Sequence, residues 1–283
     1  RSPFAVERLL RERGLPSPEV RADRPGSGRW LRKPLAGAAG QGITIAEPDR
    51  PRSPGRSRSH YYQRFVPGPS MSAVYVRARG EVRLLGVTEQ LIGEPWLNAG
   101  PFRYAGNIGP VEVPDDLRED LLRVGRVVGD ECDLLGLFGV DFIGHDGRPW
   151  VVEVNPRYPA SVEVLERATT LVTLAHHRKA FDPGAGLPVG PVQGGPVAGK
   201  AILYALRRLV VPDYSAGPLA EFLGPHIEGL GTPGAPYADI PRPGEVIEAG
   251  WPILTLLGDG DDRPGCQMGL QDRARDLLRL LFA

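Results

Sequence analysis

Two acidic side chains and an amide near the middle of the chain form the clearest chemical pattern. Glu153 and Asn155 are two residues apart in a strand-like run, so they project from the same face of that strand. Asp141 lies in the preceding strand-like run, and a three-residue loop over 146–148 places it directly opposite Glu153. A two-residue turn at Asp146-Gly147 sets charged against apolar side chains on both faces. We therefore predict the three-residue loop and the Asp141–Glu153 pair.

Facing carboxylates repel each other unless a cation lies between them. Together with the amide oxygen of Asn155, they form a set of hard oxygen ligands, which Mg²⁺ prefers when it also binds phosphates. Arg157 follows two residues later and can grip an anion with two parallel hydrogen bonds. The spacing also fits a solvated polar strand face with incidental acids, and this alternative stays open.

A lysine beside a glycine-rich segment is the second pattern. Of 34 basic residues only three are lysines, Lys33, Lys179 and Lys200. A chain that uses arginine so widely retains lysine where a compact charge is needed. Lys33 immediately precedes the run 34–42, which we expect to form a glycine-rich hairpin loop between strands over 29–33 and 43–46. Lys33 is thus the candidate for phosphate chemistry, whereas Lys179 resembles an ordinary helix end.

Helical and strand-like segments are interspersed along the chain, which predicts an α+β fold. An antiparallel meander is expected between 61 and 92, followed by strands over 136–143 and 149–155. The apolar spacing predicts helices over 3–13, 115–132, 161–181 and 270–282.

Composition shifts divide the sequence into three parts. Residues 1–181 hold both chemical patterns, with a smaller subdomain at about 17–66. A segment rich in Gly and Pro over 182–196 is expected to be a linker to a β-rich C-terminal lobe over 197–283 with a closing helix. The sequence begins inside an organised helical pattern, so we expect a segment to precede it.

The overall composition excludes several protein classes. Basic and acidic residues balance at 34 each, which argues against a general binder of nucleic acids or membrane surfaces. No apolar run is long enough to span a bilayer. Two cysteines cannot form a disulfide framework, which favours a cytoplasmic location. A near match to a phosphate-binding loop at 194–201 lacks the hydroxyl that would bind a metal, because residue 201 is Ala.

Taken together, these patterns resemble the ATP-grasp superfamily. The resemblance is carried by Lys33 with its glycine-rich loop, the run Gln63-Arg64-Phe65-Val66-Pro67-Gly68, and the set Asp141, Glu153, Asn155 and Arg157, in the correct order over residues 1 to about 181. Lys200 to Tyr204 and Gly250 to Thr255 are similar to the C-terminal lobe of ATP-dependent carboligases related to biotin carboxylase. The resemblance implies an ATP-grasp fold, in which two α+β subdomains clasp the nucleotide. The N-terminal domain common in this family is expected to be absent from this sequence.

The resemblance also implies roles for single residues. Lys33 would bind the α- and β-phosphates of ATP beneath a lid that includes Gly37, Gly40 and Gly42. Gln63 would face the adenine edge, and the hinge that reads the adenine would be formed by Arg64, Phe65 and Val66. Mg²⁺, or Mn²⁺ in its place, would be held by Asp141, Glu153 and Asn155. Arg157 would stabilise the transferred phosphoryl group or the acylphosphate.

The implied function is an ATP-dependent ligase. It would activate a small-molecule carboxylate as an acylphosphate for attack by an amine or a thiol, releasing ADP and phosphate. Nucleic acids and membranes are not expected partners, and a homodimer is left open. Carboxylation through carboxyphosphate, as in biotin carboxylase, is one alternative. A non-catalytic ATP-binding subunit is another, because neither Arg64 nor Ser70 is the acid that often binds the ribose in this family.

Overall fold

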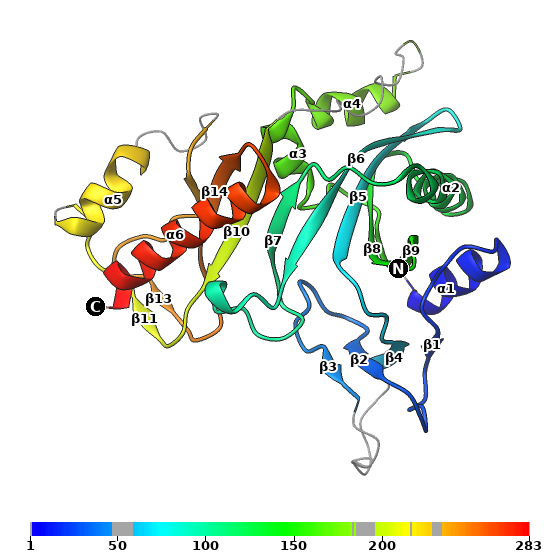
Figure 1. Cartoon of the computed structure of the whole chain (residues 1–283), viewed down its shortest axis with the longest axis horizontal. Coiled ribbons are helices and arrows are strands. Elements are labelled where there is room, and N and C mark those ends of the chain that lie inside the picture. Colours follow the sequence, from blue (N-terminus) through cyan, green and yellow to red (C-terminus); the bar gives the residue numbers. More distant parts are fainter. Residues whose placement is uncertain are drawn as a thin grey trace. The chain divides into compact units, whose positions relative to one another are not determined.

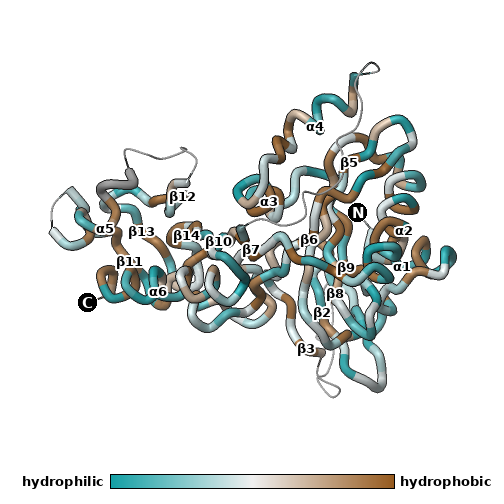
Figure 2. Tube along the Cα trace, turned by 45° about the horizontal axis from the view of Figure 1, so that its top comes forward, coloured by the Kyte–Doolittle hydropathy of each residue, from teal (hydrophilic) through white to brown (hydrophobic). Residues whose placement is uncertain are grey.

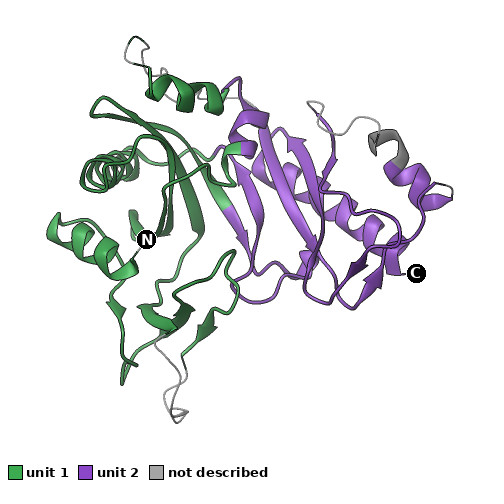
Figure 3. Cartoon of the chain, turned by 180° about the vertical axis from the view of Figure 1, so that it is seen from behind, with its two compact units in different colours: residues 1–89, 111–162, 172–191 green, residues 90–110, 163–171, 192–283 purple. Residues whose placement is uncertain are grey.

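The computed structural model describes residues 2–46, 59–182, 184, 196–215, 217–227 and 234–282. The chain divides into two compact units (Figure 3). Unit 1 comprises residues 1–89, 111–162 and 172–191, and unit 2 comprises residues 90–110, 163–171 and 192–283. Each unit is therefore built from separated stretches of chain, whereas the division expected from composition was contiguous. The expected linker over 182–196 lies outside the described residues except at 182, 184 and 196.

Unit 1 begins with a helix and a small antiparallel sheet, here called the N-terminal sheet (Figure 1). The helix α1 spans Pro3–Glu12, and the strands follow the order β1-β4-β2-β3. Their bounds are Val20–Arg21 for β1, Trp30–Pro34 for β2, Thr44–Ile45 for β3 and His60–Arg64 for β4. The pair β2 and β3 confirms the hairpin expected on both sides of the glycine-rich loop.

The second sheet of unit 1 has the strand order β6-β5-β8-β9. The bounds are Ser70–Ala78 for β5, Glu81–Ile92 for β6, Gly136–His145 for β8 and Arg148–Asn155 for β9. Helix α2 spans Asp115–Glu131 and buries Leu121, Val124 and Val128 in the same core as the strands. At Gly125 a Cβ atom would lie 2.6 Å from the ring of Tyr75, so glycine allows the helix to approach β5 closely.

The β8–β9 hairpin differs from its prediction in one respect and agrees in another. Its turn consists of Asp146 and Gly147 alone, with φ of 50° and 70°, the left-handed values of a type I′ turn. The predicted three-residue loop is therefore wrong. Asp141 nevertheless lies opposite Glu153, as predicted, because Val152 is an extra residue between the Phe142–Val151 and Asp141–Glu153 pairs. This β-bulge corrects the register that the short turn sets.

The single helix predicted over 161–181 is wrong, because the chain forms two helices there, α3 at Val162–Ala168 and α4 at Thr173–Ala180. The Thr169 hydroxyl donates to the carbonyl of Leu165 (2.6 Å) and accepts from the N–H of Leu171 (3.1 Å). A threonine that bonds its own backbone in this way competes with helix continuation.

Unit 2 has an antiparallel sheet of order β12-β14-β10-β7. Its strands are Tyr104–Gly109 (β7), Val197–Tyr204 (β10), Tyr237–Ala238 (β12) and Pro252–Gly260 (β14). Smaller elements are the 3-10 helix Pro95–Leu97, the paired strands β11 (Leu209–Val210) and β13 (Val246–Ile247), and helix α5 at Pro218–Ile227. The closing helix α6, Arg263–Phe282, begins seven residues before the predicted start at 270.

Helix α6 packs on the sheet of unit 2 at Gly199, where a Cβ atom would lie 2.7 Å from Leu270 and 2.8 Å from the Cys266 sulfur. Along both α2 and α6, hydrophobic and hydrophilic residues alternate as they do in helices that bury one face (Figure 2). None of the helices within the described ranges is long and apolar enough to cross a membrane.

Candidate functional site

The acidic pair lies between β8 and β9, the last two strands of the order β6-β5-β8-β9. Asp141 on β8 faces Glu153 on β9, and the Asn155 side chain donates a hydrogen bond to the Asp141 carboxylate (3.0 Å). Ser72 on β5 lies opposite Asp141 on its other side and is hydrogen-bonded to it. Burial raises the pKa of Asp141 to about 6; Glu153 adds to the rise, while the hydrogen bonds and the charge of Lys33 oppose it.

These residues fit a hard divalent cation. Asp141 is half-buried and lies opposite a second carboxylate, and the charge of a cation bound there would offset their repulsion. Two carboxylates and an amide oxygen are donors of the type that Mg²⁺ takes, the remaining positions being left to water or phosphate. Within the described ranges no cluster of three or more His, Cys, Asp or Glu could hold a metal. A metal at Asp141 and Glu153 therefore needs Asn155 or a bound ligand to complete its coordination.

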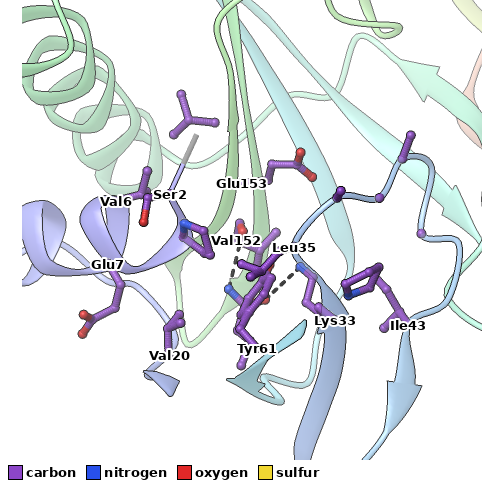
Figure 4. Close-up of a pocket in the computed structure, with 18 of the residues that line it drawn as sticks. Ser2, Val6, Glu7, Val20, Lys33, Leu35, Ile43, Tyr61, Val152 and Glu153 are labelled. Atoms are coloured by element: carbon purple, nitrogen blue, oxygen red, sulfur yellow. Dashed lines mark hydrogen bonds between the residues drawn. The ribbon is translucent and has the colours of Figure 1, made fainter. Parts of the chain in front are cut away.

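Lys33 supplies a positive charge next to the acidic pair. It projects from β2, and its ammonium donates to the side-chain carbonyl of Gln63 (3.0 Å). Burial lowers the pKa of Lys33, and the charges of Glu153 and Asp141 oppose that fall. The close-up in Figure 4 shows Lys33 and Glu153 at the same pocket. A cation held near two acids is suited to binding a polyanion together with a metal ion.

Gln63 connects the N-terminal sheet to the bulge in β9. Gln63 is 3% exposed, and its amide group donates to the carbonyl of Val152 (3.4 Å) while its side-chain oxygen accepts from Lys33. Val152 is the bulged residue, so its carbonyl has no place in the regular β8–β9 ladder. The Gln63 amide therefore provides a hydrogen-bond donor for the carbonyl of the bulged residue and an acceptor for the Lys33 ammonium.

A pocket of about 370 Å³ opens beside these residues. One wall comes from β2 and the glycine-rich loop, and the others come from α1, β4 and β9. The predicted site residues that line it are Lys33, Gly37, Gly40, Gln63 and Glu153. Those that do not line it are Gly42, Arg64, Phe65, Val66, Asp141, Asn155 and Arg157.

The predicted hinge residues are engaged at the end of β4. The Arg64 guanidinium lies 5.7 Å from the Trp30 ring centre, and that of Arg29 lies 3.9 Å from the Phe65 ring centre. The backbone N–H groups of Arg64 and Phe65 donate to the carbonyls of Glu19 (2.9 Å) and Arg29 (3.0 Å). These two N–H groups are thus already used in hydrogen bonds at the edge of the N-terminal sheet.

Arg157 lies in the exposed segment that follows β9. Its backbone N–H donates to the carbonyl of Asn155 (2.8 Å), and its guanidinium donates to the carbonyl of Tyr158 (3.0 Å). The side chain thus folds onto its own segment, close in sequence to the acidic set.

Three residues near the site were not singled out for chemistry from the sequence. Tyr61 lines the pocket, and its ring centre lies 5.8 Å from the Lys33 ammonium. Burial raises the pKa of Tyr61, and the charge of Glu153 adds to the rise. Ser72 and Ser161 form a buried pair beside Asp141. The signal for Ser72 was a polar residue within the apolar run of β5, but its partner could be found only from the strand order.

Residues 4–161 match the ATP-grasp domain family, and the chain therefore belongs to that family. The carbamoyl phosphate synthase large chain of Thermomicrobium roseum is 29% identical over 180 residues, covering 60% of this chain and 16% of that protein. The formate-dependent phosphoribosylglycinamide formyltransferase of Pyrococcus furiosus is 29% identical over 170 residues, covering 59% and 34% respectively. This chain thus matches from about a sixth to about a third of the length of these relatives.

Solved structures show the same fold over nearly the whole chain. A phosphoribosylamine–glycine ligase from Thermotoga maritima gives a TM-score of 0.63 at 17% identity, covering 96% of this chain and 74% of that one. An L-amino acid ligase from Bacillus licheniformis gives 0.68 at 16% identity, covering 98% and 71%. The expected α+β, ATP-grasp fold is confirmed.

Proposed function

We propose that this chain is the ATP-binding and catalytic part of an ATP-dependent ligase that joins a small-molecule carboxylate to an amine. One observation carries the proposal. Within an ATP-grasp domain, Asp141 faces Glu153, Asn155 donates to Asp141, and Lys33 is electrostatically coupled to both acids. This is a compact arrangement of charges suited to a metal-bound polyphosphate.

In this proposal the acidic set holds Mg²⁺, or Mn²⁺, which would offset charge on the β- and γ-phosphates when bound. Asp141, Glu153 and Asn155 supply the protein oxygens. Lys33 exchanges its bond to Gln63 for one to a phosphate oxygen, because a charge-assisted bond to phosphate is stronger than one to a neutral amide.

The glycine-rich loop would close over the phosphates. Gly40 and Gly42 have φ of 72° and 76°, and loop residues including Gly37 and Gly40 line the pocket beside Lys33. Backbone N–H groups without nearby side chains can approach phosphate oxygens closely. The adenine is proposed to lie against Gln63 to Val66. The N–H groups of residues 64 and 65 already donate to backbone carbonyls. We therefore assign the backbone contact with the adenine to Val66.

The chemistry proceeds in two displacements. A carboxylate oxygen of the substrate attacks the γ-phosphorus of ATP, the bond to the bridging oxygen breaks, and ADP leaves with the bonding electrons. The amine then attacks the acyl carbon, phosphate departs, and the amine proton passes to solvent. Arg157 would turn from its own segment to bind the acylphosphate oxygens, so that the protein acts mainly by positioning and electrostatics.

The names of similar proteins support this class of substrates. A phosphoribosylamine–glycine ligase and an L-amino acid ligase share the fold, and a formate-dependent phosphoribosylglycinamide formyltransferase matches in sequence. Glycine, amino acids and formate all carry a carboxylate. The first compounds to test are therefore small carboxylates, with amino acids and phosphoribosyl amines as acceptors.

The deciding experiment measures ADP and phosphate release by the purified chain with Mg²⁺-ATP. Release that requires both a carboxylate and an amine supports the ligase. Release that requires bicarbonate alone supports carboxylation through carboxyphosphate. Tight ATP binding with no ADP across the whole panel would indicate a non-catalytic subunit and overturn the ligase proposal.

A further inference from the structure

Two buried serines, Ser72 and Ser161, lie on the β5 side of Asp141. Ser72 on β5 and Ser161, directly before α3, are each 2% exposed, and their hydroxyl oxygens are 3.2 Å apart. Ser72 is also hydrogen-bonded to Asp141. Buried hydroxyls are costly unless they are paired, so this arrangement needs a physical reason.

The fold brings the three residues together from distant parts of the sequence. The β5–β8 register places Ser72 opposite Asp141. The segment after β9 then folds back over β8, because Pro159 packs on Gly139, where a Cβ atom would lie 2.9 Å from the proline ring. Two residues further on, Ser161 reaches Ser72. Gly139 thus leaves the space in which Pro159 packs, two residues before Ser161.

The protonation state fixes the direction of these hydrogen bonds. An ionised carboxylate only accepts, so Ser72 must donate its single proton to Asp141. The hydrogen bond between the serines must then be donated by Ser161. Asn155 donates to Asp141 from the adjacent strand, so donors on β5 and β9 constrain the carboxylate from both sides.

We propose that Ser72 and Ser161 are positioning residues that hold the Asp141 carboxylate in the orientation required for a divalent cation. This inference rests on the metal site of the proposed function. A ligand whose orientation is fixed beforehand loses less freedom on metal binding, and such outer hydrogen bonds typically change metal affinity by about 10- to 100-fold. Ser72 contacts the Asp141 carboxylate directly, whereas Ser161 acts through Ser72. Replacing Ser72 should therefore lower the metal affinity more than replacing Ser161.

A purely structural pair predicts a different result. If the hydroxyls only satisfy each other, their removal changes stability but leaves the metal affinity of the folded protein unaltered. The chain offers a matched control in unit 2, where the Thr255 hydroxyl, 3% exposed, donates to the Asp239 carboxylate (2.8 Å). Thr255→Val removes a hydrogen bond of the same kind away from the acidic pair.

The test measures the Mn²⁺ dissociation constant of the whole chain by electron paramagnetic resonance, with thermal unfolding of each variant recorded alongside. We expect Ser72→Ala to raise the dissociation constant about 10- to 100-fold, Ser161→Ala to raise it less, and Thr255→Val to leave it unchanged. Ser72→Thr, which retains the hydroxyl, should restore most of the affinity.

Two outcomes count against the inference: a folded Ser72→Ala variant with wild-type affinity, or an equal loss in Thr255→Val. Should Ser72→Ala fail to fold, Ser161→Ala decides the question in the same way. Failure of the wild-type chain itself to bind Mn²⁺, with or without ATP, would instead overturn the metal site of the proposed function.

Discussion

Asp141 lies directly opposite Glu153 because the bulge at Val152 shifts the β8–β9 register by one residue. The two-residue turn at Asp146-Gly147, continued without a bulge, would have placed Asp141 opposite Val152. The bulge therefore pairs two acids that a regular hairpin would separate. It also frees the Val152 carbonyl that accepts from Gln63, so one irregularity shapes both the acidic pair and the support of Lys33.

The acidic pair is expected to cost stability when no metal is bound. The folded pKa of Asp141, about 6, lies above its usual 3.8, so the free energy of unfolding falls as the pH rises through this interval. At pH 8 in EDTA, the free energy of unfolding of Asp141→Asn should therefore exceed that of wild type by about 1–3 kcal/mol, so the variant should unfold at a higher temperature. In Mg²⁺-ATP it should lose the stabilisation that wild type gains. Asp146→Asn, in the exposed turn, is the control for both calorimetric measurements.

Replacing Lys33 should weaken nucleotide binding without unfolding the protein. Lys33→Met removes the charge from a site where burial already lowers the pKa of the lysine, so the fold loses little. Loss of a charge-assisted bond to phosphate corresponds to an increase of about 10- to 100-fold in the ATP dissociation constant. Lys179→Met, at the exposed end of α4, should leave the constant unchanged. Isothermal titration calorimetry on both variants distinguishes the site from a general charge effect.

The Gln63 contact should contribute less than Lys33 itself. Gln63→Leu removes a neutral acceptor from Lys33 and a donor from the Val152 carbonyl, which corresponds to a weakening of ATP binding by about 3- to 10-fold. Gln267→Leu is the matched control, because Gln267 accepts from Arg263 on α6 in a similar cation–amide contact (2.9 Å). Equal titration curves for wild type and Gln63→Leu would show that the amide has no part in binding.

The two cysteines should differ in reactivity. Cys266 is buried, and its burial raises the pKa of the thiol to about 11, so about 0.1% is thiolate at pH 8. Cys132 is exposed at the end of α2 and should be alkylated first. Peptide mapping after iodoacetamide treatment measures both rates, and the rate at Cys266 should rise as the pH approaches 11. Comparable labelling of both thiols at pH 8 would contradict the packing of α6.

The sequence was informative where local rules decide the outcome. Alternation over 149–155 placed Glu153 and Asn155 on one face, and the apolar pattern located α2 to within one residue at its end. The Asp141–Glu153 pairing followed from sorting charged and apolar side chains, although the predicted loop was wrong. Charge sorting revealed the register but not the bulge, because an extra residue and a longer loop produce the same pairing.

Contacts that depend on tertiary structure were not visible. The break between α3 and α4 depends on which bonds the Thr169 hydroxyl makes, and apolar spacing does not encode that choice. Gln63 reaches Val152 across 89 residues, and Ser72 reaches Ser161 across the same separation. No spacing rule connects residues so far apart, so these contacts required the strand order.

The discontinuous units bear on how the protein can be divided for experiments. Residues 90–110 belong to unit 2, and Leu91, Leu97 and Ile108 are buried in a core shared with Leu203 and Leu270. A shortened protein ending at residue 181 would retain the first three side chains but lose the partners that cover them, and apolar surface exposed in this way promotes aggregation. The family match ends at residue 161, but the side chains that cover Leu91, Leu97 and Ile108 lie further along the chain, so we expect a fragment that follows the family boundary to aggregate.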